Sequence, residues 1–228
     1  MKKILKKILT KTGILKPRTE LPFSLSLFSI PRIHGLSFAL NYINENIHED
    51  EIKDTSFVEC GLGYGESFSY LAAFAFLKGT DIHGFDSFEG FPEPTENDQR
   101  AYGGRVKKGQ WNVNTETSIK RKLTNTRIPK SFIDNQVHLH KGYFEESLPL
   151  IDKDLKISLL NLDVDLYSSY KTCLEELFDK VIKGGIICFD EYQSDKWIGA
   201  KKAIDEFARY KDIEIYIDSL SGQAFFLK

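Results

Sequence analysis

The amino-acid sequence predicts an α/β protein built as a three-layer, doubly wound sheet of about seven strands. Two observations predict this fold. Short apolar runs alternate with longer amphipathic segments along residues 34–228, and glycines or acidic residues follow the apolar runs. Such alternation is typical of a mostly parallel sheet that helices cover on both faces. The last two runs, 213–217 and 224–227, are separated by a short turn with Gly222, which predicts an antiparallel C-terminal hairpin.

Residues 1–33 differ from the rest of the chain and are predicted to form a basic amphipathic arm. Apolar residues recur there at helical spacing among five lysines within the first eleven positions. Residues 1–16 are therefore a candidate contact with an anionic membrane surface or with a partner protein. The alternative is an arm that packs its apolar stripe on its own domain. Pro17, Pro22 and Pro31 then break the chain before the main domain, which is predicted to span residues 34–228.

Each further element is predicted from the period of its apolar residues. The strands are residues 55–60, a short run ending at Asp86, then 137–139, 157–162 and 186–189, followed by the closing hairpin. The helices are residues 34–48, 67–77, 168–182 and 199–210, with Gly184 and Gly185 ending the third, and a helical turn is expected within 142–149.

Composition limits the classes of function. The chain has 228 residues, 41% of them hydrophobic, which is enough for one large core, and its net charge of −2 gives no basis for a nucleic-acid partner. Cys60, Cys173 and Cys188 lie within apolar runs and lack a C-x-x-C spacing, which predicts buried, reduced thiols and a cytoplasmic location. No apolar run approaches the length of a membrane span, and none has the flanks of a cleavable signal.

The most informative motif is a glycine-rich turn that follows the first strand. Glu59 precedes three alternating glycines, whose missing side chains let a ligand approach the backbone and the N–H groups of the next helix. A dinucleotide fingerprint would need glycine where Glu66 stands, so a nicotinamide cofactor is disfavoured. Glu59 suits the ammonium group of S-adenosyl-L-methionine (SAM). The candidate cofactor contacts are Glu59, Gly61, Gly63, Gly65 and Ser67; the alternative is an ordinary strand-to-helix turn.

Further candidate cofactor contacts follow the next two strands. Asp86 stands where a doubly wound fold places the acid that accepts hydrogen bonds from ribose hydroxyls. Ser87 and Phe88 come directly after it and could offer adenine a hydroxyl and an aromatic face, although a place in the core is the other interpretation of Phe88. The last candidates, for the adenine edge, follow the strand 137–139: Gly142, Tyr143 and Phe144.

Acidic residues end two of the predicted central strands. Asp163 follows one, and Asp190 and Glu191 follow the next, so their side chains are expected to meet at the edge of the sheet where the glycine-rich turn lies. Buried acids need a partner, and ligands that offer only oxygen favour a hard cation such as Mg²⁺. The alternative is that these acids accept hydrogen bonds from loops, and that Asp165 caps the following helix.

Four segments resemble the macrocin O-methyltransferase family of small SAM-dependent enzymes: VECG at 58–61, GFDSFEGFP at 84–92, LDVDLY at 162–167 and GIICFDEY at 185–192. They keep a consistent order within roughly residues 55–210, and 84–92 is the most specific. The resemblance implies the Rossmann-like class I methyltransferase fold, methylation of a sugar hydroxyl, and Mg²⁺ held by Asp163, Asp190 and Glu191. The family commonly has two aspartates before the tyrosine, so the longer Glu191 is expected to shift the metal or to reach it through water.

These features together predict transfer of the SAM methyl group to a hydroxyl of a sugar or glycosylated metabolite. Asp165, beside Asp163, is the first candidate for the carboxylate that takes the hydroxyl proton, and His138 and His140 are alternative bases or structural strand residues. Two other functions stay open: a nicotinamide-dependent oxidoreductase, weakened by Glu66, and a non-catalytic SAM-binding or membrane-associated adaptor.

Residues 93–114 are polar and rich in turn formers, which predicts a lid over the acceptor, with a simple surface loop as the alternative. Lys107 and Lys108 would suit an acceptor that carries phosphate. The acceptor is expected to be a small molecule or glycan, and a homo-oligomer is a further expectation. The candidate acceptor contacts are Tyr102, Arg105, Trp111 and Tyr192.

Overall fold

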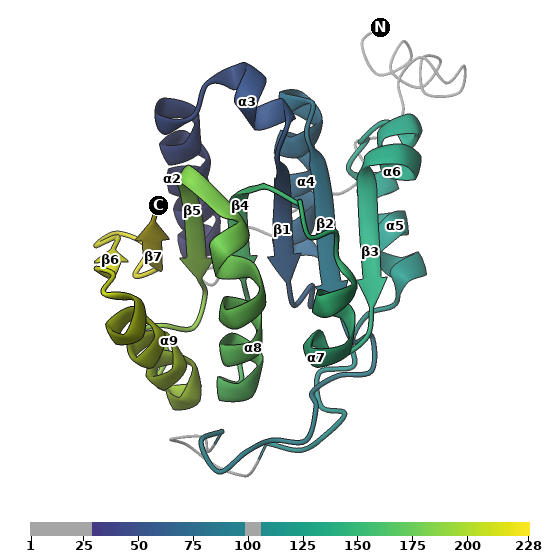
Figure 1. Ribbon diagram of the computed structural model, residues 1–228. Coiled ribbons are helices and arrows are strands. Elements are labelled where there is room, and N and C mark those ends of the chain that lie inside the picture. Colours follow the sequence, from purple (N-terminus) through teal and green to yellow (C-terminus); the bar gives the residue numbers. More distant parts are fainter. Residues whose placement is uncertain (1–28, 99–105) are drawn as a thin grey trace, which may run out of the picture.

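The strands of the computed structural model, which describes residues 29–98 and 106–228, form one sheet in the order β3-β2-β1-β4-β5-β7-β6 (Figure 1). β1 to β5 are parallel, and β7 runs antiparallel to both β5 and β6. This arrangement confirms the predicted doubly wound sheet with its C-terminal hairpin. The strands are β1 (Ser56–Cys60), β2 (Asp81–Asp86), β3 (Val137–Lys141), β4 (Ile157–Leu162), β5 (Val181–Phe189), β6 (Tyr216–Ile217) and β7 (Ala224–Leu227).

Helices cover both faces of the sheet, because the central strands bury side chains on both sides. In β1, Phe57 belongs to one buried cluster while Val58 and Cys60 belong to the other, as the two-residue period of a strand requires. The first cluster lies under α2 (Ser29–Asn46), α4 (Glu66–Lys78), α5 (Glu116–Asn125) and α6 (Lys130–Gln136). The second lies under α7 (Phe144–Ser147), α8 (Tyr167–Leu177) and α9 (Ile198–Lys211), which are in front in Figure 1.

The N-terminal helix of the described chain begins earlier than predicted. α2 starts at Ser29 and contains Pro31 in its first turn, where the missing N–H group would have no partner inside the helix. The boundary predicted between residues 33 and 34 therefore falls inside α2. The candidate membrane contact, residues 1–16, lies outside the described residues. Within the described parts of the chain, no helix has the length and apolar character that crossing a membrane requires.

The predicted helix 168–182 ends too late. α8 stops at Leu177, a 3₁₀ turn (Phe178–Lys180) follows, and Val181 already pairs with Ile157 of β4. Gly184, with φ of +82°, and Gly185 form an irregularity inside β5 instead of ending a helix, because the register passes from Val181 opposite Ile157 to Ile186 opposite Leu159.

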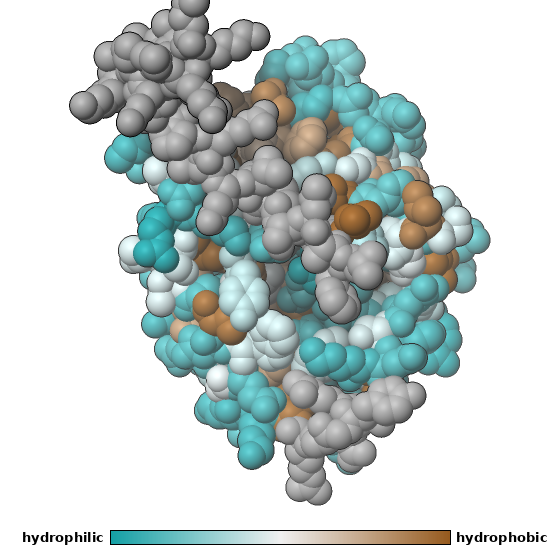
Figure 2. Space-filling view, turned by 180° about the vertical axis from the view of Figure 1, so that it is seen from behind, coloured by the Kyte–Doolittle hydropathy of each residue, from teal (hydrophilic) through white to brown (hydrophobic). Residues whose placement is uncertain are grey.

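Other differences are smaller. The first strand of the hairpin, β6, covers only Tyr216–Ile217 of the predicted 213–217. The structure adds α3 (Glu49–Lys53), α5 and α6, to which the apolar pattern assigned no element, and α5 begins with a capping box between Thr115 and Ser118. Seen from behind, on the side of α2, α4 and α5, apolar residues form separate spots among hydrophilic ones (Figure 2).

Candidate functional site

A cavity of about 560 Å³ lies at the carboxyl ends of β1, β2, β4 and β5. This is where doubly wound sheets bind ligands. It brings together most of the residues that the sequence suggested for a site. Those that line it are Gly61, Gly63, Ser67, Asp86, Ser87, Trp111, Gly142, Tyr143, Phe144, Asp163, Asp165, Asp190 and Glu191. Tyr102 and Arg105 lie outside the described residues.

The glycine-rich turn needs glycine for a steric reason at Gly61. Its φ is +81°, and a Cβ atom built there would lie 1.9 Å from the carbonyl oxygen of Asp163, which follows the neighbouring strand β4. At Gly63, with φ of +45°, a Cβ atom would meet nothing within 4 Å. Gly65 is the N-cap of α4 and does not line the cavity. The turn therefore brings the backbone close to the end of β4.

Glu59 lies beneath the turn and does not line the cavity. Its side chain is fully buried, its Oε1 accepts a hydrogen bond of 2.5 Å from the hydroxyl of Ser67, and its Oε2 has no partner among the described residues. Burial raises the pKa of Glu59 well above its usual range, against the effect of the Ser67 hydrogen bond. Ser67 does line the cavity, so Glu59 influences the cavity through its hydrogen bond with the Ser67 hydroxyl.

Asp86 is held in place by the backbone of its own loop and of the glycine-rich turn. Its Oδ2 accepts from the N–H of Leu62 at 2.9 Å, and its Oδ1 accepts from the N–H of Phe88 at 2.7 Å. Asn114, which the sequence reasoning missed, adds its side-chain amide at 3.3 Å and also donates to the carbonyl of Gly63 at 2.7 Å. The ring of Phe88 packs in the core, with 8% of the residue exposed, so its interpretation as an aromatic face for the cofactor is corrected to a core residue.

Asp163, Asp190 and Glu191 form an acidic cluster. Each offers a carboxylate oxygen, and these oxygens lie within 4.8 Å of one another. Burial and the charge of Asp190 raise the pKa of Asp163 to about 6, although Arg32 opposes them. Burial and then Asp163 raise the pKa of Glu191 well above its usual range, and the hydroxyl of Tyr170 hydrogen-bonds to Glu191 Oε2. A cation would relieve this repulsion, and three oxygen donors fit a hard ion such as Mg²⁺.

Arg32 of α2 supplies a cation to the same cluster, which no local sequence pattern indicated. Its Nε donates to Asp190 Oδ1 at 3.0 Å, its Nη2 contacts Asp190 Oδ2, and the same Nη2 lies 3.3 Å from Asp163 Oδ2. Its side chain is 37% exposed and lines the cavity. The guanidinium therefore partly neutralises the carboxylates that are suited to a metal ion.

Asp165 also lines the cavity, and its φ of +57° places it in the left-handed region. Burial, and then the charge of Asp163, raise the pKa of Asp165 well above its usual range, while Lys196 opposes them. A raised pKa makes a carboxylate a stronger base.

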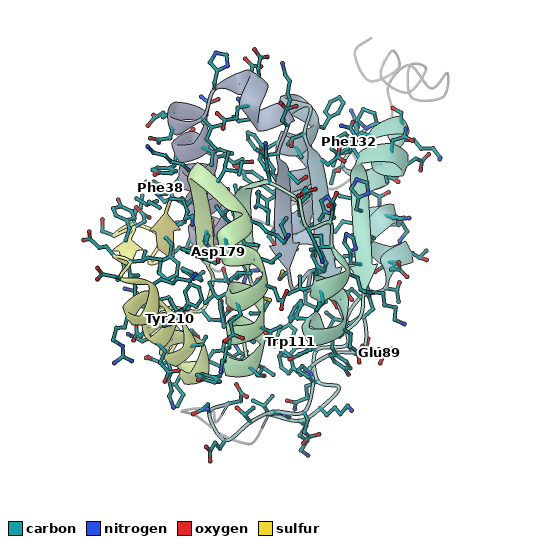
Figure 3. The ribbon with its side chains drawn as sticks, in the orientation of Figure 1. Phe38, Glu89, Trp111, Phe132, Asp179 and Tyr210 are labelled. Atoms are coloured by element: carbon teal, nitrogen blue, oxygen red, sulfur yellow. The ribbon has the colours of Figure 1, made fainter. Side chains whose placement is uncertain are left out.

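Aromatic rings and a lysine lie at another part of the cavity wall. Lys196 places its Nζ 5.1 Å from the ring centroid of Trp111 and 4.6 Å from that of Trp197, and the rings of Trp111 and Tyr64 form a T-shaped pair with centroids 6.4 Å apart. Trp111 lies below the carboxyl ends of the strands in Figure 3. The sequence reasoning selected Trp111 but missed Trp197 and Lys196. The flat faces of the two tryptophans can pack against a ring of a ligand, and the Lys196 ammonium can pair with a negative charge on that ligand.

The predicted lid is anchored at both of its described ends. Asp98 is buried and accepts from the N–H of Tyr167 at the start of α8 at 2.6 Å. On the return path, Asn114 bonds to Gly63, and the N–H of Gly109 donates to the carbonyl of Phe91 at 2.9 Å. Figure 1 shows the described parts of this loop, residues 93–98 and 106–114, passing beneath the carboxyl ends of the strands.

Three other candidates lie away from the cavity. Tyr192 is 8% exposed, its hydroxyl donates to Asp205 at 2.8 Å, and Lys201 lies over its ring, so its interpretation as an acceptor contact is corrected to a structural residue beside α9. His138 and His140 lie on β3, and neither lines the cavity, which removes them as alternative bases.

Comparisons with known proteins indicate the family of this chain. The family model described as Macrocin-O-methyltransferase (TylF) matches residues 31–228. Demethyldecarbamoylnovobiocin O-methyltransferase of Streptomyces niveus is 31% identical over 133 residues, which cover 56% of this chain and only 47% of that protein. The 8-demethyl-8-(2,3-dimethoxy-alpha-L-rhamnosyl)-tetracenomycin-C 4'-O-methyltransferase of Streptomyces olivaceus is 25% identical over 190 residues, 82% of this chain and 70% of that protein.

Solved structures show the same fold. The calicheamicin methyltransferase CalS11 has a TM-score of 0.76 at 21% identity, covering 99% of this chain and 91% of that chain. The O-methyltransferase NovP has a TM-score of 0.70 at 19% identity, covering 99% and 97%. The fold is thus that of class I methyltransferases. Since the family model spans residues 31–228, the chain belongs to the macrocin O-methyltransferase family.

Proposed function

We propose that this protein transfers the methyl group of SAM to a hydroxyl of a sugar or glycosylated small molecule, with Mg²⁺ held by Asp163, Asp190 and Glu191. The observation that carries the proposal is one cavity in which the glycine-rich turn and Asp86 lie beside three converging carboxylates. The names of the two Streptomyces relatives, both O-methyltransferases, support the reaction, and the rhamnosyl group in one of them supports a sugar acceptor.

The donor would lie against the glycine-rich turn. Backbone N–H groups already hold both oxygens of Asp86, which keeps the carboxylate directed for the two ribose hydroxyls. The hydroxyl of Ser67 donates its hydrogen to Glu59. The lone pairs of the Ser67 oxygen therefore remain to accept a hydrogen bond from the ammonium group of SAM. Tyr143 and Phe144 line the wall that we assign to adenine.

The acceptor would lie between the acidic cluster and the aromatic wall. When bound, Mg²⁺ would orient the acceptor hydroxyl and lower its pKa. Trp111 and Trp197 would hold the sugar ring, and alignment of its oxygen with the methyl carbon can contribute several kcal/mol. Asp165, whose pKa is raised, would take the proton at its carboxylate. The buried free cysteines support a reducing, cytoplasmic location.

The test is calorimetry followed by a transfer assay. We expect SAM to bind and NAD not to bind, and we expect a methyl-labelled SAM to label glycosylated small molecules or nucleotide sugars when Mg²⁺ is present. EDTA should remove the labelling and added Mg²⁺ should restore it. NAD binding without SAM binding would indicate an oxidoreductase, SAM binding without labelling of any acceptor class would favour an adaptor, and labelling unaffected by EDTA would contradict the metal assignment.

Replacing Arg32 by glutamine is expected to tighten Mg²⁺ binding by about tenfold, because the guanidinium and the ion compete for the same carboxylates. Without Mg²⁺ the variant should unfold a few degrees lower than the wild type, since the buried acids lose their counter-ion, and saturating Mg²⁺ should close that difference. Calorimetry and thermal unfolding measure the two effects. Arg209→Gln, on the exposed face of α9, is the control. Weaker Mg²⁺ binding by Arg32→Gln would show that Arg32 organises the acids instead of competing for them.

A further inference from the structure

Three of the five histidines of the chain lie together on one face of the sheet edge, outside the cavity. His83 of β2 is the register partner of His138 of β3, and His140 follows two residues later on the same face. Asp81 precedes His83 by two residues and faces the same side. β3 is the edge strand, so this block of four side chains is held by two parallel strands at the open side of the sheet.

The four side chains contact one another directly. His138 Nε2 lies 2.9 Å from Asp81 Oδ2, and His83 Nδ1 lies 3.0 Å from His140 Nε2. The His83 and His138 rings are stacked with centroids 4.6 Å apart. The side chains of His138 and Asp81 are 38% and 41% exposed, so an ion can reach them from solvent.

The hydrogen bonds within this block determine which ring nitrogens remain for a metal ion. A neutral imidazole has one free lone pair. In the tautomer in which His83 Nδ1 donates to His140 Nε2, the lone pair of His83 Nε2 is left for a metal ion, and His140 fixes that tautomer.

We propose that Asp81, His83 and His138 bind a divalent first-row transition metal, with Zn²⁺ as the best fit, and that His140 orients His83. One ligand atom of each of the three residues lies within 4.8 Å of the others, and binding zinc at roughly 2.0–2.2 Å would require the three side chains to turn toward one point. Two imidazoles with one carboxylate select zinc, nickel or copper over Mg²⁺. The ion would link the edge strand β3 to β2 and stabilise the fold, separately from the methyl-transfer cavity.

Zinc titration of the full chain, stripped with EDTA and dialysed, tests the site. In saturating Mg²⁺, which would occupy the acidic cluster of the cavity, we expect one Zn²⁺ per chain at micromolar concentration, a further rise in unfolding temperature when Zn²⁺ is added, and visible absorption with Co²⁺. His138→Gln and, separately, Asp81→Asn should weaken Zn²⁺ binding by at least about tenfold, with folding checked by circular dichroism.

Two matched variants make the result specific. His34→Gln should leave the affinity unchanged, since His34 is likewise partly exposed and lies 3.5 Å from a carboxylate, that of Asp218. Asp190→Asn should also leave it unchanged, because Asp190 belongs to the acidic cluster of the cavity. Binding that survives both His138→Gln and Asp81→Asn, binding that Asp190→Asn removes, or no binding at 100-fold excess over the expected range would overturn the proposal.

Discussion

Replacing Asp190 by asparagine is expected to lower the turnover number of methyl transfer by about a hundredfold or more, while SAM affinity changes by less than about threefold. Asp190 contributes an oxygen to the acidic cluster at the end of β5, whereas the proposed donor contacts lie after β1, β2 and β3. The amide keeps the size of the side chain but removes the charge that would hold Mg²⁺. The loss should therefore appear in catalysis and in metal affinity, and not in donor binding.

Steady-state kinetics and calorimetry with SAM and Mg²⁺ measure the three quantities on one preparation. Asp179→Asn is the control, because Asp179 is exposed and pairs only with Lys211 among the salt bridges of the described chain. That variant should retain wild-type kinetics. A loss of SAM binding in Asp190→Asn, with Mg²⁺ affinity preserved, would move Asp190 from the metal site to the donor site.

Gly61→Ala is expected to destabilise the protein by about 3 kcal/mol or more, whereas Gly63→Ala should cost only about 1 kcal/mol. Both alanines would have to adopt a positive φ, but only at Gly61 does the new Cβ atom meet a backbone oxygen, that of Asp163, at 1.9 Å. Relief of that clash would push the turn away from β4 and displace Asp163. Urea unfolding of the two variants and the wild type gives the comparison; equal losses would mean that the backbone conformation alone decides the cost.

The fold was largely predictable because its signals are local. Buried parallel strands produce short apolar runs, and the turn after β1 requires glycine at positions that a sequence displays directly. The error at the end of α8 has a local cause too: Val181 and Ile182 continue the apolar pattern of the helix, and two glycines look like its end. Only the pairing of Val181 with β4 shows that the strand has already begun.

The site was predictable as far as strand ends determine it. Parallel strands end at one edge of the sheet, so the sequence predicts that Asp86, Asp163 and Asp190 lie near one another although it gives no distances. In the structure these three residues line one cavity. The side-chain direction of Phe88 and Tyr192 was not predictable, since either aromatic ring can turn toward core or ligand from the same position in the sequence. Arg32 stands 158 residues before its partner Asp190, so no spacing rule connects them.

The position of Arg32 has a consequence for how the protein can be handled. Several carboxylates that converge in one pocket repel one another, and this repulsion normally destabilises the fold until a cation binds. Here the chain carries its own positive charge into that pocket on α2, so purification in the presence of chelators should still yield a folded protein, ready to be loaded afterwards.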